Sequence, residues 1–170
     1  SPLRVAAAEV LAKRSRQILK ERPSESLVAM GDFNTIPSDK PHPFHSVLYQ
    51  DGLYHDVHQL FQDDRDISHK QKKGMPPGTY FYAPKMSWNL LDRFFVNQNL
   101  LDEKGIELQK ESYRILANKN MTETYKYDGK SHYLKGSVVK GVPKRYNHNA
   151  KKASKAGFSD HFPISVQLTY

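Results

Sequence analysis

The chain contains no cysteine among its 170 residues. Disulfide bonds and thiolate chemistry are therefore excluded, and any bound metal ion must be held by oxygen or imidazole ligands. Long hydrophobic runs are also missing, since no apolar stretch approaches the roughly 18 residues of a membrane-spanning helix. Tryptophan occurs only once, but ten tyrosines and eight phenylalanines supply enough large side chains for the core of one folded domain.

Acidic residues are scarce in the last third of the chain. Between Lys119 and Lys155, ten basic residues stand against two acids, so this segment accounts for the whole net charge of +8. Such a concentration of positive charge suits a polyanionic partner, whereas the alternative is a lysine-rich loop that only keeps the chain soluble. The tyrosines among these lysines either stack on nucleic-acid bases or anchor the segment to the domain. They are Tyr125, Tyr127, Tyr133 and Tyr146.

The hydrophobic pattern predicts a mixed α/β fold in which strands dominate. An amphipathic helix is expected over residues 1–22, with Leu3, Val10 and Leu11 on its buried face and Pro23 at its end. Residues 117–156 show no sustained periodicity, so we expect them to form a basic excursion from the domain. Strands are expected over residues 26–30, 79–82, 90–96, 106–116 and 162–170.

The motif Gly31-Asp32-Phe33-Asn34 directly follows the first expected strand. Asp32 and Asn34 are two residues apart, so at a strand end their side chains can converge on one ligand. A carboxylate can take a proton from attacking water, and an amide can orient that water or donate to a developing oxyanion. Asp and Asn are also common in turns after strands, which is the competing interpretation of the motif.

Two further acids are placed where chemistry can use them. Asp160-His161 comes just before the last expected strand, between Gly157 and Pro163. Asp92 lies within an otherwise apolar strand, where an unpaired carboxylate would be costly to bury. We therefore expect Asp92 to have a partner, and His161 is a candidate because an aspartate would orient and stabilise its imidazolium.

Taken in chain order, these three motifs resemble the endonuclease/exonuclease/phosphatase superfamily, which has the DNase I-like fold. The resemblance implies an α/β (α+β) architecture in which two β-sheets pack face to face as a sandwich, with helices outside. It also implies that the protein is a phosphoester hydrolase. Related proteins carry a basic residue shortly before Ser-Asp-His, so Arg145 is expected to contact a substrate phosphate.

The resemblance assigns a role to each motif residue. Asp32 is implied to be the general base or the carboxylate that orients water, and Asn34 a contact to the phosphate. Asp160 is implied to be a metal ligand, while Asp92 would orient His161 against the scissile phosphate. The implied cofactor is Mg²⁺, with Mn²⁺ or Ca²⁺ as alternatives.

The chain departs from the family in one respect. Family members carry an Asn and a metal-binding Glu in a first half of comparable size, and we find no such segment here. We therefore expect residues 1–170 to form the C-terminal half of one such domain, with the basic excursion at about residues 117–156. The other half would belong to the same polypeptide or to a separate chain. Without its Glu, the isolated fragment is expected to have little turnover.

The sequence thus favours a Mg²⁺-dependent phosphodiesterase, nuclease or phosphatase in which activated water attacks phosphorus. The basic excursion favours a nucleic-acid substrate, while phosphoinositide and sphingomyelin head groups remain alternatives. A hypothesis from another class is a non-catalytic module that binds polyanions and retains only the scaffold. The presence of all five motif residues argues against that second hypothesis.

Overall fold

The chain folds into two units, each built from segments that are separated in the sequence. The first unit consists of residues 1–72, 91–113 and 165–170, and the second of residues 73–90 and 114–164. The computed structural model describes the backbone of all 170 residues and every side chain except those of Ala153 and Ser154. Helices occur together with several antiparallel sheets, which confirms the predicted mixed α/β class. Of the described helices, none has the length and apolar character needed to cross a bilayer.

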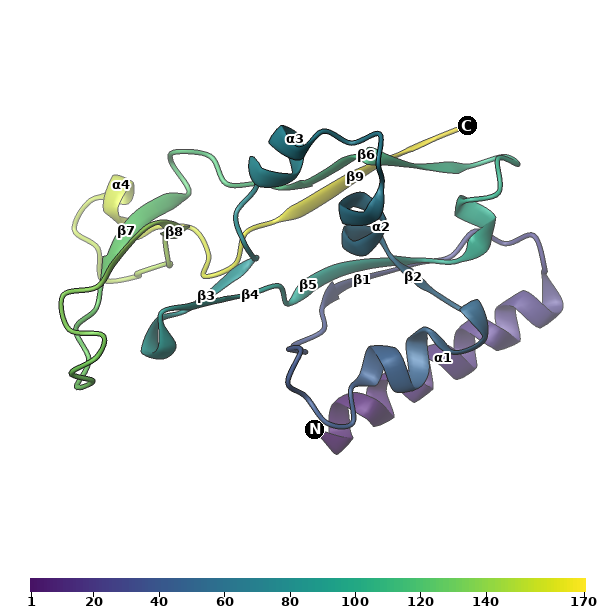
Figure 1. Ribbon diagram of the computed structural model, residues 1–170, viewed down its shortest axis with the longest axis horizontal. Helices are drawn as coiled ribbons and strands as arrows, with labels where there is room; N and C mark the ends of the chain where they lie inside the picture. Colours follow the sequence, from purple (N-terminus) through teal and green to yellow (C-terminus); the bar gives the residue numbers. More distant parts are fainter. The chain divides into compact units, whose positions relative to one another are not determined.

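The helices and strands divide between the two units according to where most of their residues lie (Figure 1). The elements of the first unit are α1 (Pro2–Glu21), β1 (Val28–Asp32), the π-helical turn η1 (Phe44–Leu48), the short turn η2 (Gln50–Gly52), β2 (His55–Asp56), α2 (Val57–Asp63), α3 (His69–Lys73), β5 (Asp92–Val96), η4 (Gln98–Leu100), β6 (Glu107–Ile115) and β9 (Ile164–Thr169). Those of the second unit are β3 (Tyr80–Tyr82), η3 (Ala83–Lys85), β4 (Ser87–Asn89), β7 (Thr122–Lys126), β8 (Val138–Pro143) and α4 (Ala153–Ala156).

In the first unit, β5 is the central strand of a three-stranded antiparallel sheet, with β1 on one side and β2 on the other (Figure 1). The β1–β5 ladder runs from the pair Val28–Val96 to the pair Asp32–Asp92. Phe95 is fully buried in the cluster that this sheet forms with α1 and η1. Since side chains alternate along a strand, Asp92 points to the face opposite that of Arg93 and Phe95.

Helix α1 packs through its smallest side chains. Its buried residues are Ala8, Ala12 and Ser15, and because these are short, the helix backbone can approach its neighbours closely. Leu3 and Val10 are 81% and 71% exposed, so the prediction that they lie on the buried face is wrong. Hydrophobic patterning weights large apolar residues, whereas close packing here requires small ones.

The second unit contains two antiparallel hairpins, β3–β4 and β7–β8. The Phe81 ring on β3 lies 5.4 Å from Trp88 on β4 and 5.7 Å from Tyr125 on β7, so this one side chain joins the two hairpins. Phe162, which follows the Asp-His motif, stacks on Trp88 at 6.1 Å. The aromatic cluster therefore ties the end of that motif to β4.

The strands predicted from hydrophobic patterning are confirmed at β1, β3, β5, β6 and β9. The β7–β8 hairpin, by contrast, lies within residues 117–156, where no regular element was predicted. The segment Thr122–Lys126 has Tyr125 as its one apolar residue, and the adjacent residues Glu123 and Thr124 are both exposed. A register shift between Glu123 and Thr124 further interrupts the pairing. Both features obscure the period of two that marks a half-buried strand.

Candidate active site

Asp32 and Asp92 form the last pair of the β1–β5 ladder. Directly opposed residues of an antiparallel pair share one face of the sheet, with Cα atoms about 4.5–5.5 Å apart. Asp32 is exposed and Asp92 is half-buried. Carboxylates on one face of a sheet offer the oxygen ligands that hard cations prefer, and they can also transfer protons. This end of the sheet therefore suits cation binding or proton transfer.

Asn34 lies just beyond the ladder in a left-handed backbone conformation, with φ at 46°. Asparagine tolerates this conformation better than most residues do. The backbone N–H of Asn34 donates to Oδ1 of Asp32 over 2.7 Å, which closes a tight turn around the carboxylate. The turn interpretation and the functional interpretation of this motif are therefore compatible, because the turn itself fixes the Asp32 carboxylate next to Asn34.

Arg4 of α1 holds this turn from outside the motif. Its guanidinium donates to the backbone carbonyl of Asn34 and, over 2.8 Å, to Oδ1 of Asp39. The other carboxylate oxygen of Asp39 accepts from the backbone N–H of Ile36 at 2.9 Å. Sequence reasoning missed Arg4 and Asp39, since neither is close in sequence to the other or adjacent to the motif. We call these two residues the Arg4–Asp39 clamp.

In the second unit, His161 pairs with Tyr80 of β3 through an isolated antiparallel bridge. The two rings lie 4.9 Å apart, and His161 is half-buried. The backbone N–H of His161 also donates to Oγ of Ser159 at 3.1 Å. Tyr80 was predicted only as a strand residue, but it forms one wall beside the histidine.

Arg145 completes this group. Its guanidinium lies 5.6 Å from the centroid of the Tyr80 ring and donates to the Phe81 carbonyl at 3.2 Å. Gly157 passes close to the backbone of Arg145. A Cβ atom added to Gly157 would lie 2.0 Å from the Arg145 carbonyl oxygen. Only glycine allows this approach, and it fixes Arg145 beside the segment that leads into Asp160.

Asp160 and Arg145 line the same pocket, which has a volume of about 230 Å³. Glu123 and Tyr125 of β7 contribute to its wall, together with Phe81. Both Asp160 and Arg145 are exposed side chains, so solvent and ligands can reach them. One acidic and one basic group facing a small open pocket can bind a cation and an anion side by side, as a metal-phosphate site requires.

The predicted site residues therefore fall into two groups. Asp32, Asn34 and Asp92 are together in the first unit, while Arg145 and Asp160-His161 are together in the second. Asp92 and His161 belong to different units, and the proposed interaction between them stays a prediction. Each unit alone therefore contains only some of the site residues that the sequence motifs predicted.

The donor atoms of these groups suit a hard cation. They are carboxylate and amide oxygens, which Mg²⁺, Mn²⁺ and Ca²⁺ prefer to nitrogen or sulfur. Among the residues that the structure describes, no cluster of three or more His, Asp or Glu side chains could enclose a metal ion. The donor set thus fits the kind of Mg²⁺ site that uses one or two carboxylates and otherwise binds water and phosphate.

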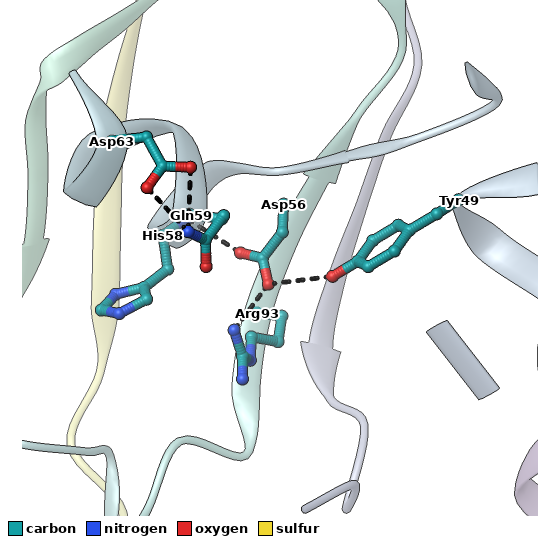
Figure 2. A network of polar contacts seen from close by, with 6 residues as sticks. All are labelled: Tyr49, Asp56, His58, Gln59, Asp63 and Arg93. Carbon is teal, nitrogen blue, oxygen red and sulfur yellow. Dashed lines mark hydrogen bonds and ion pairs between the residues drawn. The ribbon is translucent and has the colours of Figure 1, made fainter. Parts of the chain in front are cut away.

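Arg93, the neighbour of Asp92, serves a different purpose on the other face of the sheet. Its Nη1 lies 2.5 Å from Oδ2 of Asp56, and these side chains are only 15% and 4% exposed. Figure 2 shows that Asp56 also accepts from the Tyr49 hydroxyl, while its Oδ1 accepts from the backbone N–H of His58 at 2.9 Å. Burial, with Asp56 nearby, raises the pKa of Tyr49 well above its ordinary value. The network joins β2, α2 and β5.

A cavity of about 600 Å³ opens next to this network and contains three of the histidines. Two of them, His42 and His45, have ring centroids 4.6 Å apart. Burial and the neighbouring His45 lower the pKa of His42, so its imidazole favours the neutral form that binds metals. In the described part of the chain, these two histidines belong to no group of three or more His, Asp or Glu side chains that could hold a metal ion.

A family model for the Endonuclease/Exonuclease/phosphatase family matches residues 1–170. The chain therefore belongs to this family, which indicates phosphoester hydrolysis as its general activity. No curated protein and no solved structure matches the chain. The expectation that these residues form the C-terminal half of a domain is separate from the family assignment and stays a prediction.

Proposed function

We propose that the chain supplies catalytic residues for metal-dependent hydrolysis of phosphodiesters, with nucleic acid as the favoured substrate. The observation that carries the proposal is the register of the β1–β5 ladder, which sets Asp32 directly opposite Asp92 with Asn34 immediately beyond. Two carboxylates and an amide at one strand end provide oxygen ligands for a hard cation and a group that can accept a proton from water.

Within the first unit, Asp32 acts as the general base or orients the attacking water. One of its oxygens accepts from the Asn34 backbone, so the carboxylate has a fixed direction while the other oxygen is available to water. The Asn34 side chain donates to a phosphate oxygen whose negative charge grows in the transition state. Asp92 supplies a second carboxylate on the same face as Asp32 at this strand end.

Within the second unit, His161 and Arg145 bind the scissile phosphate, and Tyr80 keeps their side chains in place. Asp160 is the metal ligand, and Glu123 lines the same pocket as an additional carboxylate. The bound Mg²⁺, or Mn²⁺ or Ca²⁺ in its place, would supply positive charge next to the phosphate oxygens. A divalent ion held by so few protein ligands would bind weakly, so we propose that a carboxylate from outside residues 1–170 completes the site.

The test compares hydrolysis by the complete natural polypeptide and its variants Asp160→Ala and His161→Ala. Substrates are plasmid DNA, RNA, sphingomyelin and a phosphoinositide, each assayed with Mg²⁺ and with a chelator. Each substitution should lower kcat by about 10²- to 10⁴-fold, the range for losing one acid–base or electrostatic group. Asp66→Ala, which changes an exposed aspartate, is the matched control and should retain full activity.

Three outcomes would contradict the proposal or a part of it. Unchanged hydrolysis in both Asp160→Ala and His161→Ala would show that these residues have no catalytic role. Salt-dependent binding of nucleic acid without hydrolysis by the complete polypeptide would instead favour the non-catalytic polyanion-binding module. The isolated 170-residue chain should have little turnover, and robust Mg²⁺-dependent hydrolysis by it would show that no outside ligand is needed.

A further inference from the structure

The β7–β8 hairpin and its connecting loop, residues 122–143, form a basic arm of the second unit. Four lysines on this arm are exposed, two of them on the strands and two in the loop. They are Lys126, Lys130, Lys135 and Lys140. None of the four takes part in the ion pairs recorded for the described residues, which involve other cations.

The two acids of the basic arm leave these lysines unneutralised. Asp128 accepts a hydrogen bond from the Tyr125 hydroxyl over 2.8 Å. Glu123 faces the pocket that contains Asp160. Four exposed ammonium groups on one short hairpin repel one another, so a polyanion bound along the arm would relieve that repulsion.

The tyrosines of the basic arm have separate roles that the sequence could not distinguish. Tyr125 packs against Phe81 and donates to Asp128. The Tyr127 hydroxyl accepts from the backbone N–H of Ser131 over 3.1 Å, and this side chain is half-buried. Tyr133, in contrast, is 99% exposed at the tip of the loop. Its ring is the one that can stack on a ligand.

We propose that the basic arm binds single-stranded nucleic acid, with its exposed lysines on the phosphates and Tyr133 stacked on a base. This assignment of substrate class rests on the proposed hydrolase function. An exposed ring can stack on an unpaired base but not on a base inside a duplex. A membrane surface fits less well, because interfacial anchoring requires several exposed apolar side chains. Tyr127 and Leu134 of this loop are half-buried, so Tyr133 has only Val138, 49% exposed on β8, beside it as an exposed apolar side chain of the arm.

The other side of the basic arm connects this surface to the candidate site. Glu123, Tyr125 and Val142 of the arm line the same pocket as Arg145 and Asp160. A strand bound along the arm therefore has a phosphate within reach of that pocket. The arm would thus act as the binding surface that delivers the substrate, while the pocket holds the reacting phosphate.

Binding is measured by fluorescence anisotropy with a labelled single strand of about 15 nucleotides, a length that covers common single-strand sites. A chelator is present throughout, so neither metal nor turnover affects the result. The four lysines of the arm are changed together to Gln. We expect this variant to bind at least 10-fold more weakly, with a salt slope smaller by about 3, since each lost phosphate contact removes about 0.7.

The matched control also changes four exposed lysines to Gln, but outside the basic arm: Lys13, Lys20, Lys70 and Lys104. Net charge falls equally in both variants, so the position of the charge is the only difference. The control should bind within about 2-fold of the parent chain, a change below 0.5 kcal/mol. Equal weakening of both variants would overturn the proposal, because it would show attraction to overall charge alone.

Tyr133 is tested separately. Tyr133→Ala should weaken binding by about 5- to 150-fold at an unchanged salt slope, the range for one stacked base, and Tyr133→Phe should bind like the parent chain. Parent-like binding by Tyr133→Ala would overturn the stacking assignment. Equally tight binding of a duplex of the same length would exclude single-strand recognition. Binding to anionic phospholipid vesicles but not to the oligonucleotide would assign the arm to a membrane instead.

The binding experiment and the hydrolysis experiment can give opposite results, so the two proposals are tested separately. If Asp160→Ala abolishes hydrolysis but the lysine and Tyr133 variants bind normally, the basic arm has no role in binding and the hydrolase assignment stands. If those variants lose binding while Asp160→Ala remains active, the arm assignment stands and the proposed role of Asp160 is wrong. Circular dichroism and urea unfolding check that each variant is folded.

Discussion

Two arginine–aspartate neighbourhoods in this chain have opposite characters. Arg93 and Asp56 are buried and only 2.5 Å apart, and Asp56 has additional hydrogen bonds to Tyr49 and to the backbone of α2. Arg145 and Asp160 are both exposed and face one small pocket. The residue types are identical, but the charges of the first pair are satisfied within the protein, whereas those of the second face solvent.

The difference follows from desolvation. A buried charge is stable only when a partner and hydrogen bonds replace its lost hydration, so Asp56 and Arg93 have no capacity left for a ligand. Exposed groups retain their hydration and can exchange water for a phosphate or a metal ion at little cost. Burial and partner number, rather than residue type, therefore separate a structural pair from a binding pair.

The largest expected effect is on stability and distinguishes the two aspartates directly. Asp56→Ala leaves the Arg93 charge buried without its partner and should lower the free energy of unfolding by about 3–5 kcal/mol. Asp160→Ala removes an exposed group and should change it by less than about 0.5 kcal/mol. Urea denaturation of both variants measures the comparison. Equal losses in the two variants would show that the aspartates have similar structural roles.

Replacing both members of the buried pair sharpens the same comparison. The double variant Asp56→Leu with Arg93→Met substitutes apolar side chains for both charges, which is often neutral for a buried pair. It should therefore recover most of the stability lost in Asp56→Ala. If the double variant is as unstable as Asp56→Ala, the hydrogen bonds of Asp56 to Tyr49 and α2 contribute more than the ion pair itself.

The next effect concerns binding of the phosphate. Arg145→Ala should lower kcat/KM of the complete polypeptide for a phosphodiester by about 10- to 100-fold, the value of a hydrogen bond to a charged group. Stability should fall by about 1 kcal/mol or less, since Arg145 is exposed. Arg145→Lys should restore part of the activity by retaining the charge. A large stability loss without a change in kcat/KM would make Arg145 a structural residue like Arg93.

The Arg4–Asp39 clamp should have a smaller effect on the first unit. Asp39→Asn weakens the ion pair with Arg4 and the hydrogen bond to Ile36, so the turn around Asp32 should lose its fixed geometry. We expect stability to fall by about 1 kcal/mol and kcat to fall about 10-fold, with KM nearly unchanged. Arg4→Lys should rescue part of the kcat loss seen in Arg4→Gln. A rise in KM alone would contradict a positioning role.

The smallest expected effect is a pH dependence centred on His58. Burial lowers the pKa of His58 in the folded state from the ordinary value of 6.5. Below pH 6.5 the unfolded chain therefore binds a proton that the folded chain does not, and stability should fall as the pH decreases. The slope cannot exceed about 1.4 kcal/mol per pH unit for this one group. His58→Gln should make the profile less steep below pH 6.5, and the part of the slope that remains should include the contribution of His42, whose pKa is also lowered.

Local sequence signals predicted the strands that alternate strongly and the turn motif at Asp32 and Asn34. They failed where the structure depends on long-range contacts. Nothing near Arg4 in the sequence indicates that it reaches Asn34 and Asp39, more than 29 residues away. On α1, the predicted Leu11 does pack against the core, but Ala8 and Ala12 were missed because alanine carries little hydrophobic signal, although its small size is what allows close packing.

The candidate site also combines residues that local motifs predicted with residues that only the fold brings together. The acids and His161 were proposed as site residues because they lie in motifs that resemble a family pattern in the correct order. Tyr80 was missed because a tyrosine in a strand is ordinarily a packing residue, and only the position of its ring next to His161 and Arg145 distinguishes it. Strand alternation alone accounts for Arg93 facing Asp56 on the side of the sheet opposite Asp92.

The crossing of Gly157 over Arg145 bears on how this region can change during evolution. The carbonyl of Lys144 accepts from the N–H of Phe158 at 2.9 Å, so within the second unit the chain returns to nearly the same point after residue 157. Residues 146–156 between these points form a closed loop whose ends are fixed. Lengthening such a loop costs little entropy, about 0.6 kcal/mol for each doubling. Related sequences can therefore insert or delete residues here while Arg145 and Asp160 keep their places.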